Sequence, residues 1–167
     1  MGFNRPKKSI TQKFQHFLFW FLAASSLQLA AFSCTTVDLY EKSVVIPGHA
    51  WQSSFKPAFT FTITDTTRPY QLFLVLRHTE KYNFNNIYIK LQVHQAGGKT
   101  SDFIEDITLA TQEGWSGSGM DDIYEHRKKI AAPLFFQKGS YTFTLEQIMR
   151  EDPLQHVLNV GLRLEKQ

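Results

Sequence analysis

Hydrophobic and polar residues alternate in several short runs between residues 58 and 165, and this is the period of a β-strand with one buried face. The alternating runs are "AFTFTIT" (58–64), "NIYIKLQVH" (86–94), "GSYTFTL" (139–145) and "LNVGLRLE" (158–165). A further run, "YQLFLVLRH" (70–78), is apolar almost throughout, which is typical of a central strand. Turn-forming stretches such as "DTTRPY", "QAGGK" and "EGWSGSG" separate the runs. The pattern predicts a mainly β, antiparallel fold of the β-sandwich or jelly-roll kind.

One segment near the C-terminus departs from this period. In "TLEQIMRED" (144–152), Thr144 and Gln147 have the spacing of a capping box, and Asp152 before Pro153 is a stop signal for a helix. The sequence therefore predicts one short helix here, which would close one end of the sandwich.

The N-terminal segment has the order of a secretory signal peptide. Four basic residues, the last of them Lys13, precede an apolar stretch (17–33) that ends in small residues. The alternative is an uncleaved membrane anchor, which the polar residues in the second half of this stretch disfavour. Cys34, the only cysteine in the chain, follows directly.

A cysteine in this place predicts attachment of lipid. The segment looks like a bacterial lipoprotein signal, although Ala31 stands where such signals usually have leucine. Two or three acyl chains on Cys34 would hold the protein on a membrane almost permanently. We therefore expect a signal peptide at 1–33, a lipidated tether at 34–36 and a single β-sandwich domain at 37–167.

The charge of the predicted mature chain argues against a nucleic-acid partner. Residues 1–33 contain four of the 18 Lys and Arg and none of the 15 Asp and Glu, which leaves a net charge of −1. Phosphate binding requires a concentrated basic face. The one basic cluster, "HRKK" (126–129), follows acidic residues and is interpreted as a solvated strand or loop edge.

The known catalytic and metal-binding patterns are missing from the sequence. The histidines have no metal-ligand spacing, and Ser116 lacks the following glycine of G-x-S-x-G. The acidic pairs at 105–106 and 121–122 stand outside any calcium-loop pattern, and exposed turn carboxylates are the favoured interpretation. We predict no catalytic residue, no metal and no cofactor, and thus a protein that is not an enzyme.

Aromatic side chains are the remaining candidates for a binding surface. Trp115 stands among three glycines in "EGWSGSGMDD" (113–122). It is either a stacking platform for a sugar or a partner, or a side chain folded back onto the open end of the sandwich. The second alternative is favoured because burial of a tryptophan stabilises the fold by a few kcal/mol. Tyr82 and Tyr88 pose the same choice.

Four stretches together resemble one known family. These are "ITDTTRPYQLFLVLRHTEKYNFNNIYIKL" (63–91), the "GWSGSG" loop (114–119), "KGSYTFTLEQIMREDPL" (138–154) and "NVGLRLE" (159–165). They resemble the GldH family of gliding-motility lipoproteins from Bacteroidota, and Arg77, Tyr82, Tyr88 and Trp115 are among the matching residues. We take these four residues as the candidate surface for a partner or ligand.

The resemblance implies a noncatalytic envelope lipoprotein that is needed for gliding and linked to the type IX secretion machinery. The implied partners are the membrane, through the lipid on Cys34, and other proteins of that machinery. The stretch "TTVDLYEK" (35–42) lacks the acidic run that directs lipoproteins of this phylum to the cell surface, so the periplasmic face of the outer membrane is the expected location. The main alternative is a carbohydrate-binding envelope lipoprotein with Trp115 or the Tyr82–Tyr88 aromatics as its platform, and an envelope hydrolase is the third.

Overall fold

The alternating runs form strands whose apolar side chains face one core. The computed structural model describes residues 39–98 and 100–167. In β3 (Ala58–Ile63) every second residue is buried, and β5 (Asn86–Gln95) buries its aliphatic side chains in the same way. β4 (Tyr70–Thr79) is buried on both faces over much of its length, as expected of a central strand.

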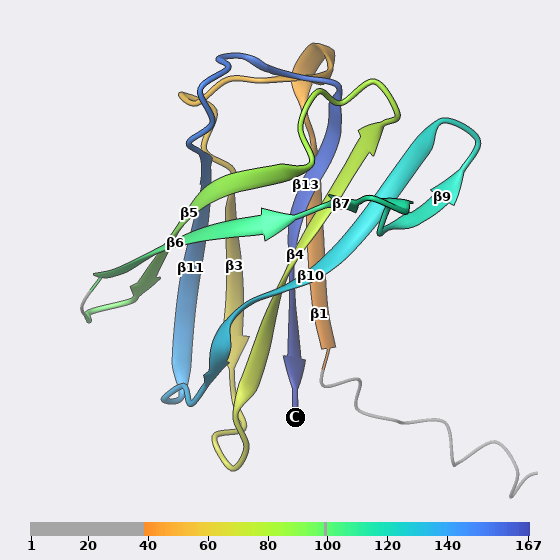
Figure 1. The fold of residues 1–167 in the computed structure, drawn as a ribbon. Coiled ribbons are helices and arrows are strands. Elements are labelled where there is room, and N and C mark those ends of the chain that lie inside the picture. Colours follow the sequence, from red (N-terminus) through yellow and green to blue (C-terminus); the bar gives the residue numbers. More distant parts are fainter. Residues whose placement is uncertain (1–38, 99) are drawn as a thin grey trace, which may run out of the picture. The chain divides into compact units, whose positions relative to one another are not determined.

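Two larger antiparallel sheets organise the described part of the chain (Figure 1). The first consists, in spatial order, of β1 (Leu39–Val45), β13 (Val157–Lys166), β4, β10 (Ile123–Leu134) and β9 (Ser118–Met120). The second consists of β3, β11 (Gly139–Gln147), β5 and β6 (Thr100–Thr108). The remaining strands form two short pairs. These are β2 (Ala50–Trp51) with β12 (Leu154–Gln155) and β7 (Ala110–Thr111) with β8 (Gly114–Trp115). The prediction of a mainly β, antiparallel protein is confirmed.

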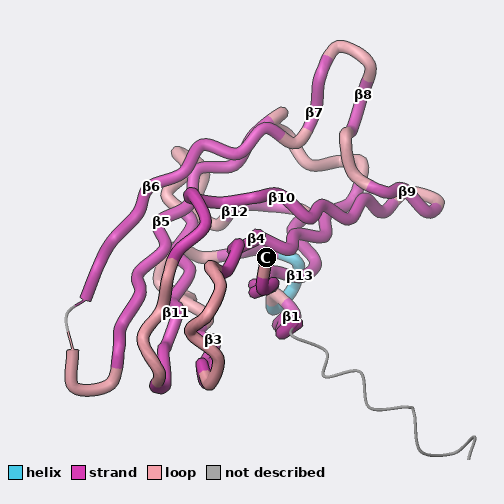
Figure 2. Tube along the Cα trace, turned by 90° about the horizontal axis from the view of Figure 1, so that it is seen from below, coloured by secondary structure: helices cyan, strands magenta, loops and turns pink. Residues whose placement is uncertain are grey.

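The two sheets enclose one hydrophobic core. Figure 2 shows β3, β11, β5 and β6 as one layer and β1, β13, β4 and β10 as the other. Leu74 and Leu162 of the first sheet and Leu91 and Phe143 of the second are fully buried members of the same cluster. Burial of apolar surface between two sheets is the main stabilising contribution in such a two-layer fold.

The predicted helix near the C-terminus is not formed. Residues 144–147 belong to β11, where Thr144 pairs with Ala58 and Gln92 on either side. The capping-box spacing is a local signal, whereas Gln147 is held by tertiary contacts: it is fully buried, and its Nε2 donates to the Trp51 carbonyl oxygen over 3.3 Å. Sheet pairing and burial therefore outweigh the local preference. The helical element in the described residues is a 3₁₀ turn, η2 (Pro47–His49).

The strand register defines two opposite ends of this domain. At one end Leu39 pairs with Glu165, and Tyr70 pairs with both Lys166 and Leu134, so that the loops 64–69 and 135–138 lie there. We call this the entry end, because the described chain begins there. At the opposite end, the far end, β4 and β10 meet at Thr79 and Ile123, next to the loops 80–85 and 148–153.

Several predictions concern residues outside the described part of the chain. The signal peptide at 1–33, the tether at 34–36, the acylation of Cys34 and the domain boundary at residue 37 stay predictions for this reason. Among the residues that the structure describes, no helix has the length and apolar character needed to cross a membrane.

Candidate interaction surfaces

The glycine-rich loop around Trp115 folds back onto the inner face of the first sheet. β8 pairs with β7 through Trp115 and Ala110, and both the amide and the hydroxyl of Ser116 donate to the Leu109 carbonyl oxygen over 2.8 Å. These contacts place the half-buried indole of Trp115 with its ring centroid 4.4 Å from that of His78. Trp115 is thus folded back against the domain and partly buried among the rings of His78, Tyr82 and Tyr124.

Beneath Trp115 lies a pair of buried histidines that the sequence analysis did not single out. His78 on β4 and His126 on β10 are almost fully buried, and their Nε2 atoms are 2.9 Å apart. The Nδ1 atom of His78 lies 2.8 Å from the Thr79 carbonyl oxygen. A carbonyl only accepts, so His78 carries its hydrogen on Nδ1 and accepts with Nε2 from the Nε2–H of His126. In the neutral pair, these roles give one tautomer for each ring.

Burial lowers the pKa of both histidines and so favours their neutral forms. Loss of solvation lowers the pKa of His126 to about 4, and both the repulsion between the protonated forms of the two rings and the charge of Lys128 act in the same direction. Burial also lowers the pKa of His78, although the hydrogen bond to Thr79 opposes this. The interpretation of "HRKK" as a solvated edge is therefore wrong for His126, which is 1% exposed.

Gly117 closes this cluster on the side of His126. A Cβ atom added at Gly117 would lie 2.5 Å from the Glu125 carbonyl oxygen and 2.9 Å from His126 Nδ1. Any side chain at this position would force the loop away from the histidines. Gly117 therefore allows the loop to cover the histidine pair, which gives a structural reason for glycine at this position.

Tyr82 belongs to the same buried cluster. It is 4% exposed, and its hydroxyl donates to the Asn86 carbonyl oxygen over 3.0 Å. Burial raises the pKa of Tyr82, and the charge of Glu151 adds to this. Its ring centroid lies 5.0 Å from that of His78. Tyr82 is therefore a core residue at the far end of the domain, not a binding platform.

Tyr88 lies outside this cluster, in a groove at the far end. The tyrosine is 41% exposed, and the groove holds about 450 Å³. Its lining residues are Phe84, Asn86, Tyr88, Ile148, Met149 and Arg150. The Tyr88 hydroxyl shares Asp106 with the side-chain amide of Asn86, and this hydrogen bond to the carboxylate raises the pKa of Tyr88. The groove thus combines apolar side chains with an amide and a guanidinium group, and the Asp106 carboxylate is hydrogen-bonded to two of its lining residues.

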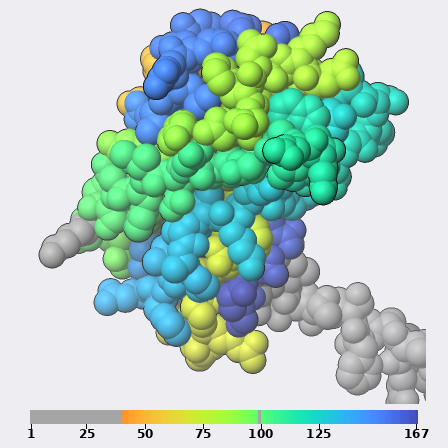
Figure 3. Space-filling model, viewed as in Figure 1, coloured from red at the N-terminus to blue at the C-terminus, as the bar shows by residue number. Residues whose placement is uncertain are grey.

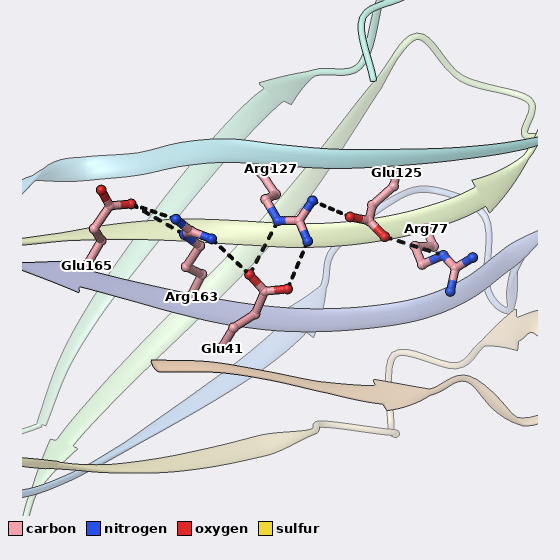
Figure 4. Close-up of polar contacts among 6 residues, drawn as sticks. All are labelled: Glu41, Arg77, Glu125, Arg127, Arg163 and Glu165. Atoms are coloured by element: carbon pink, nitrogen blue, oxygen red, sulfur yellow. Dashed lines mark hydrogen bonds and ion pairs between the residues drawn. The ribbon is translucent and has the colours of Figure 1, made fainter. Parts of the chain in front are cut away.

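Arg77 lies on the outer face of the first sheet, within a ladder of charged side chains (Figure 4). The ladder contains Glu165, Arg163, Glu41, Arg127, Glu125 and Arg77, contributed by β13, β1, β10 and β4. Three arginines and three glutamates alternate along it, so its formal charge is zero. Such an alternating row is suited to holding the four strands together and has little net attraction for a charged ligand.

Glu41 is the central residue of this charged ladder. Its carboxylate accepts from Arg127 over 3.1 Å and from Arg163 over 3.3 Å. The two guanidinium groups, Arg127 foremost, hold the pKa of Glu41 below its usual range against a smaller opposing effect of burial. Beside the ladder, Gly161 pairs with Ser43, and an added Cβ would lie 2.4 Å from the Lys42 carbonyl oxygen. Close packing of β1 against β13 therefore requires glycine here.

The four residues of the predicted candidate surface do not form one site. Trp115 and Tyr82 pack in the buried histidine cluster, Tyr88 lines the far-end groove, and Arg77 belongs to the charged ladder. Within the described residues, no group of three or more His, Cys, Asp or Glu side chains is arranged to hold a metal ion. The groove around Tyr88 is an exposed site that the sequence did not predict, because Ile148 and Met149 were expected on a helix.

The fold and these surfaces define a small antiparallel β domain with a groove at one end. Residues 38–164 match the family described as GldH lipoprotein, and the chain belongs to this family. It is 27% identical over 143 residues to "Gliding motility lipoprotein GldH" of Flavobacterium johnsoniae, which covers 81% of this chain and 89% of that protein. It is 28% identical over 144 residues to "Gliding motility lipoprotein GldH homolog" of Christiangramia forsetii, which covers 80% and 87%. No solved structure matches significantly.

Proposed function

We propose that this protein is a noncatalytic envelope lipoprotein that takes part in gliding motility by binding other envelope proteins through its β domain. The observation that carries the proposal is the family match over residues 38–164, together with relatives named as gliding motility lipoproteins. The lipid is attached to Cys34, which follows the apolar segment of the leader. The missing enzyme motifs support the noncatalytic part.

The groove around Tyr88 is the surface through which we propose that the domain binds a protein partner. Tyrosine, methionine and arginine side chains, all present in this groove, are enriched at protein interfaces. Tyr88 is 41% exposed and Ile148 is 39% exposed, whereas most large apolar side chains of the described domain are buried. Arg150 at the rim of the groove provides a donor for a carboxylate or a backbone carbonyl of the partner.

The proposed partners are proteins of the gliding and type IX secretion machinery, and the proposed location is the periplasmic face of the outer membrane. Both rest on the resemblance to the family and on the stretch 35–42, which has no acidic run after Cys34. A periplasmic position would let an anchored domain meet machinery that spans the envelope.

A deletion in the native host tests this proposal. The strain is complemented with wild type, Cys34→Ala or Tyr88→Ala, and gliding and secretion of type IX cargo are scored at matched protein abundance. We expect wild type to restore both activities, Cys34→Ala to fail because the anchor is lost, and Tyr88→Ala to be impaired with the anchor intact. A deletion strain that glides and secretes normally would overturn the motility role.

One observation favours a second candidate function, carbohydrate binding. The exposed ring of Tyr88 lies beside the Asn86 amide and the Asp106 carboxylate, and a ring next to hydrogen-bonding groups is suited to a sugar. A glycan array with wild type and Tyr88→Ala separates the two functions. Saccharide binding that disappears in the variant would favour this candidate, and wild type without saccharide binding leaves the protein-binding groove.

A further inference from the structure

The entry end of the domain carries one exposed aromatic side chain and two exposed basic ones. Phe135 in the loop after β10 is 74% exposed and forms one wall of a hollow of about 370 Å³. Arg68 and Lys138, in the two loops of this end, are exposed and have no ion-pair partner among the described residues. In Figure 3 the segments 64–69 and 135–140 form the lower end of the molecule.

The Asp and Glu side chains described at this end are paired with basic groups. Asp65 forms an ion pair with Lys166 and accepts two hydrogen bonds from Thr67. Glu165 lies 3.0 Å from the guanidinium of Arg163. Among the described Lys, Arg, Asp and Glu side chains of the entry end, the charges without a partner are therefore those of Arg68 and Lys138.

The far end has the opposite character. The exposed carboxylates Glu80, Asp121 and Asp122 lie together there, since the Glu80 amide donates to the Asp122 carbonyl oxygen over 2.7 Å. Lys81 and Arg150 are exposed cations of the same end. Negative charge beside the β9–β10 turn is repelled by anionic headgroups, whereas the entry end attracts them.

The position of Cys34 fixes which end lies near the membrane. Four residues, 35–38, separate Cys34 from Leu39, the first residue of β1. Even fully extended, a chain of this length spans at most about 18 Å between the two Cα atoms. β4 runs over 10 residues from the entry end to the far end, which is a length of about 30 Å. The anchor therefore holds the entry end, and not the far end, close to the bilayer.

We propose that the entry end binds the surface of the bilayer that holds the lipid anchor, with the Phe135 ring in the interfacial region and Arg68 and Lys138 at the phosphates. This inference rests on the proposed acylation of Cys34. An exposed phenylalanine beside basic side chains can bury its ring at the boundary between headgroups and acyl chains, and the basic side chains add attraction to anionic lipid. The contact presents the far-end groove around Tyr88 away from the membrane, where a protein partner has access.

Site-specific fluorescence in vesicles tests the orientation. Mature Phe135→Cys lipoprotein is purified from membranes, labelled with an environment-sensitive fluorophore and reconstituted with phosphatidylethanolamine and phosphatidylglycerol. Cys34 is the only native cysteine and its sulfur is occupied by lipid, so the introduced thiol is the single labelling site. The matched control is Val45→Cys, which is 63% exposed at the other end of β1. Nitroxide-labelled lipid serves as the quencher.

We expect quenching at position 135 to be several-fold stronger than at position 45, with a blue shift of emission only at 135. Charge reversal in Arg68→Glu/Lys138→Glu should lower the quenching at 135 towards the control value while the protein stays in the membrane fraction. Equal quenching at both positions, in a protein that carries lipid, would overturn the orientation and leave the anchor standing. A label at 135 that is shielded from water but not quenched by the lipid would point to a protein contact and also overturn it.

The wild-type chain separates failure of the anchor from failure of the orientation. Acylated wild type should take up no fluorophore, because it has no free thiol. Labelling of wild type at Cys34 would show that the thiol is free. In that case the proposed anchor falls, and the membrane contact of the entry end falls with it.

Discussion

Acidification from about pH 7.5 to about pH 5 should destabilise the protein through the buried pair His78 and His126. The pKa of His126 is about 4 in the folded state, against an ordinary value of 6.5. Between these two values the unfolded chain binds a proton that the folded protein does not. The contribution of the neutral, buried His126 to the free energy of unfolding is therefore complete above pH 6.5, and it decreases as the pH falls towards 4.

The expected loss follows from the two pKa values. At about pH 5, a histidine with a pKa of 6.5 when unfolded and about 4 when folded reduces the free energy of unfolding by about 2 kcal/mol. The lowered pKa of His78 adds a loss in the same direction. The carboxylates with lowered pKa values, such as Glu41 and Asp102, stabilise the fold above their ordinary values of 4.5 and 3.8 and lose this contribution only at lower pH. The chosen window therefore reports on the histidines.

Urea unfolding followed by circular dichroism, at several pH values in this window, measures the loss. His126→Phe keeps a ring of similar shape and removes the titrating group, so its stability should depend less on pH than that of wild type. At about pH 7.5 the variant should be less stable by about 1 kcal/mol, because His78 loses its hydrogen-bond donor. His94→Phe, at an exposed position, is the control and should keep the wild-type pH dependence. Equal pH dependence in wild type and His126→Phe would refute the reasoning.

Three further substitutions test the packing described above. Gly161→Ala should lower the free energy of unfolding by about 1–3 kcal/mol, because its Cβ would lie 2.4 Å from the Lys42 carbonyl oxygen. Ser43→Ala is the control. If Gly161→Ala leaves the thermal unfolding unchanged, the close packing of β1 against β13 is contradicted. Trp115→Ala should cost about 2 kcal/mol in urea unfolding, since the half-buried indole covers the histidine pair, and unchanged stability would argue for a free platform. Glu41→Gln should lower the free energy of unfolding by under about 1 kcal/mol, and high salt should diminish this difference between the variant and wild type. A difference that does not change with salt would exclude the ion pairs as its origin.

The strands could be predicted from the sequence because their signal is local. Period-two alternation in 58–63 and 86–94 states directly which side chains face the core, and the structure has the same parity. The helix at 144–152 failed for a reason that is not local. Thr144 lies in a strand and pairs with Ala58 on one side and with Gln92 on the other. Both partners are more than 50 residues away in the sequence, so a rule that considers only the nine residues 144–152 cannot detect this pairing.

The histidine pair marks the limit of sequence reasoning about sites. The parity of each strand was available, because His78 continues the inward series of Leu72, Leu74 and Leu76, and His126 shares the parity of Ile130. What brings the two rings together is the register of β4 against β10, in which His126 pairs with Leu76 and His78 with Tyr124. Register depends on pairing over about fifty residues of intervening chain and is not encoded in either strand alone.

The separation of Tyr82 from Tyr88 has a similar cause. Both stand in one aromatic stretch of the sequence, yet Tyr82 precedes β5 and packs under its own loop, whereas Tyr88 is an outward position of that strand. Side chains on β5 alternate between the core and solvent, so a tyrosine at an even position faces outward whatever its apolar character. A single aromatic platform was therefore excluded once the start of β5 at Asn86 was known.

The charged ladder and the proposed anchor meet in one strand. Leu39 begins β1, and any force between a lipid on Cys34 and the folded domain enters through this edge strand. The backbone hydrogen bonds between antiparallel strands are perpendicular to the strand axis. A force along β1 therefore acts on all its backbone hydrogen bonds with β13 at the same time. Glu41 adds contacts to both β13 and β10, and Lys42 donates to the Thr60 carbonyl oxygen of the second sheet over 2.7 Å. As an edge strand, β1 is otherwise paired on one side only. These side-chain contacts therefore strengthen the attachment of the strand through which a tether would pull on the domain.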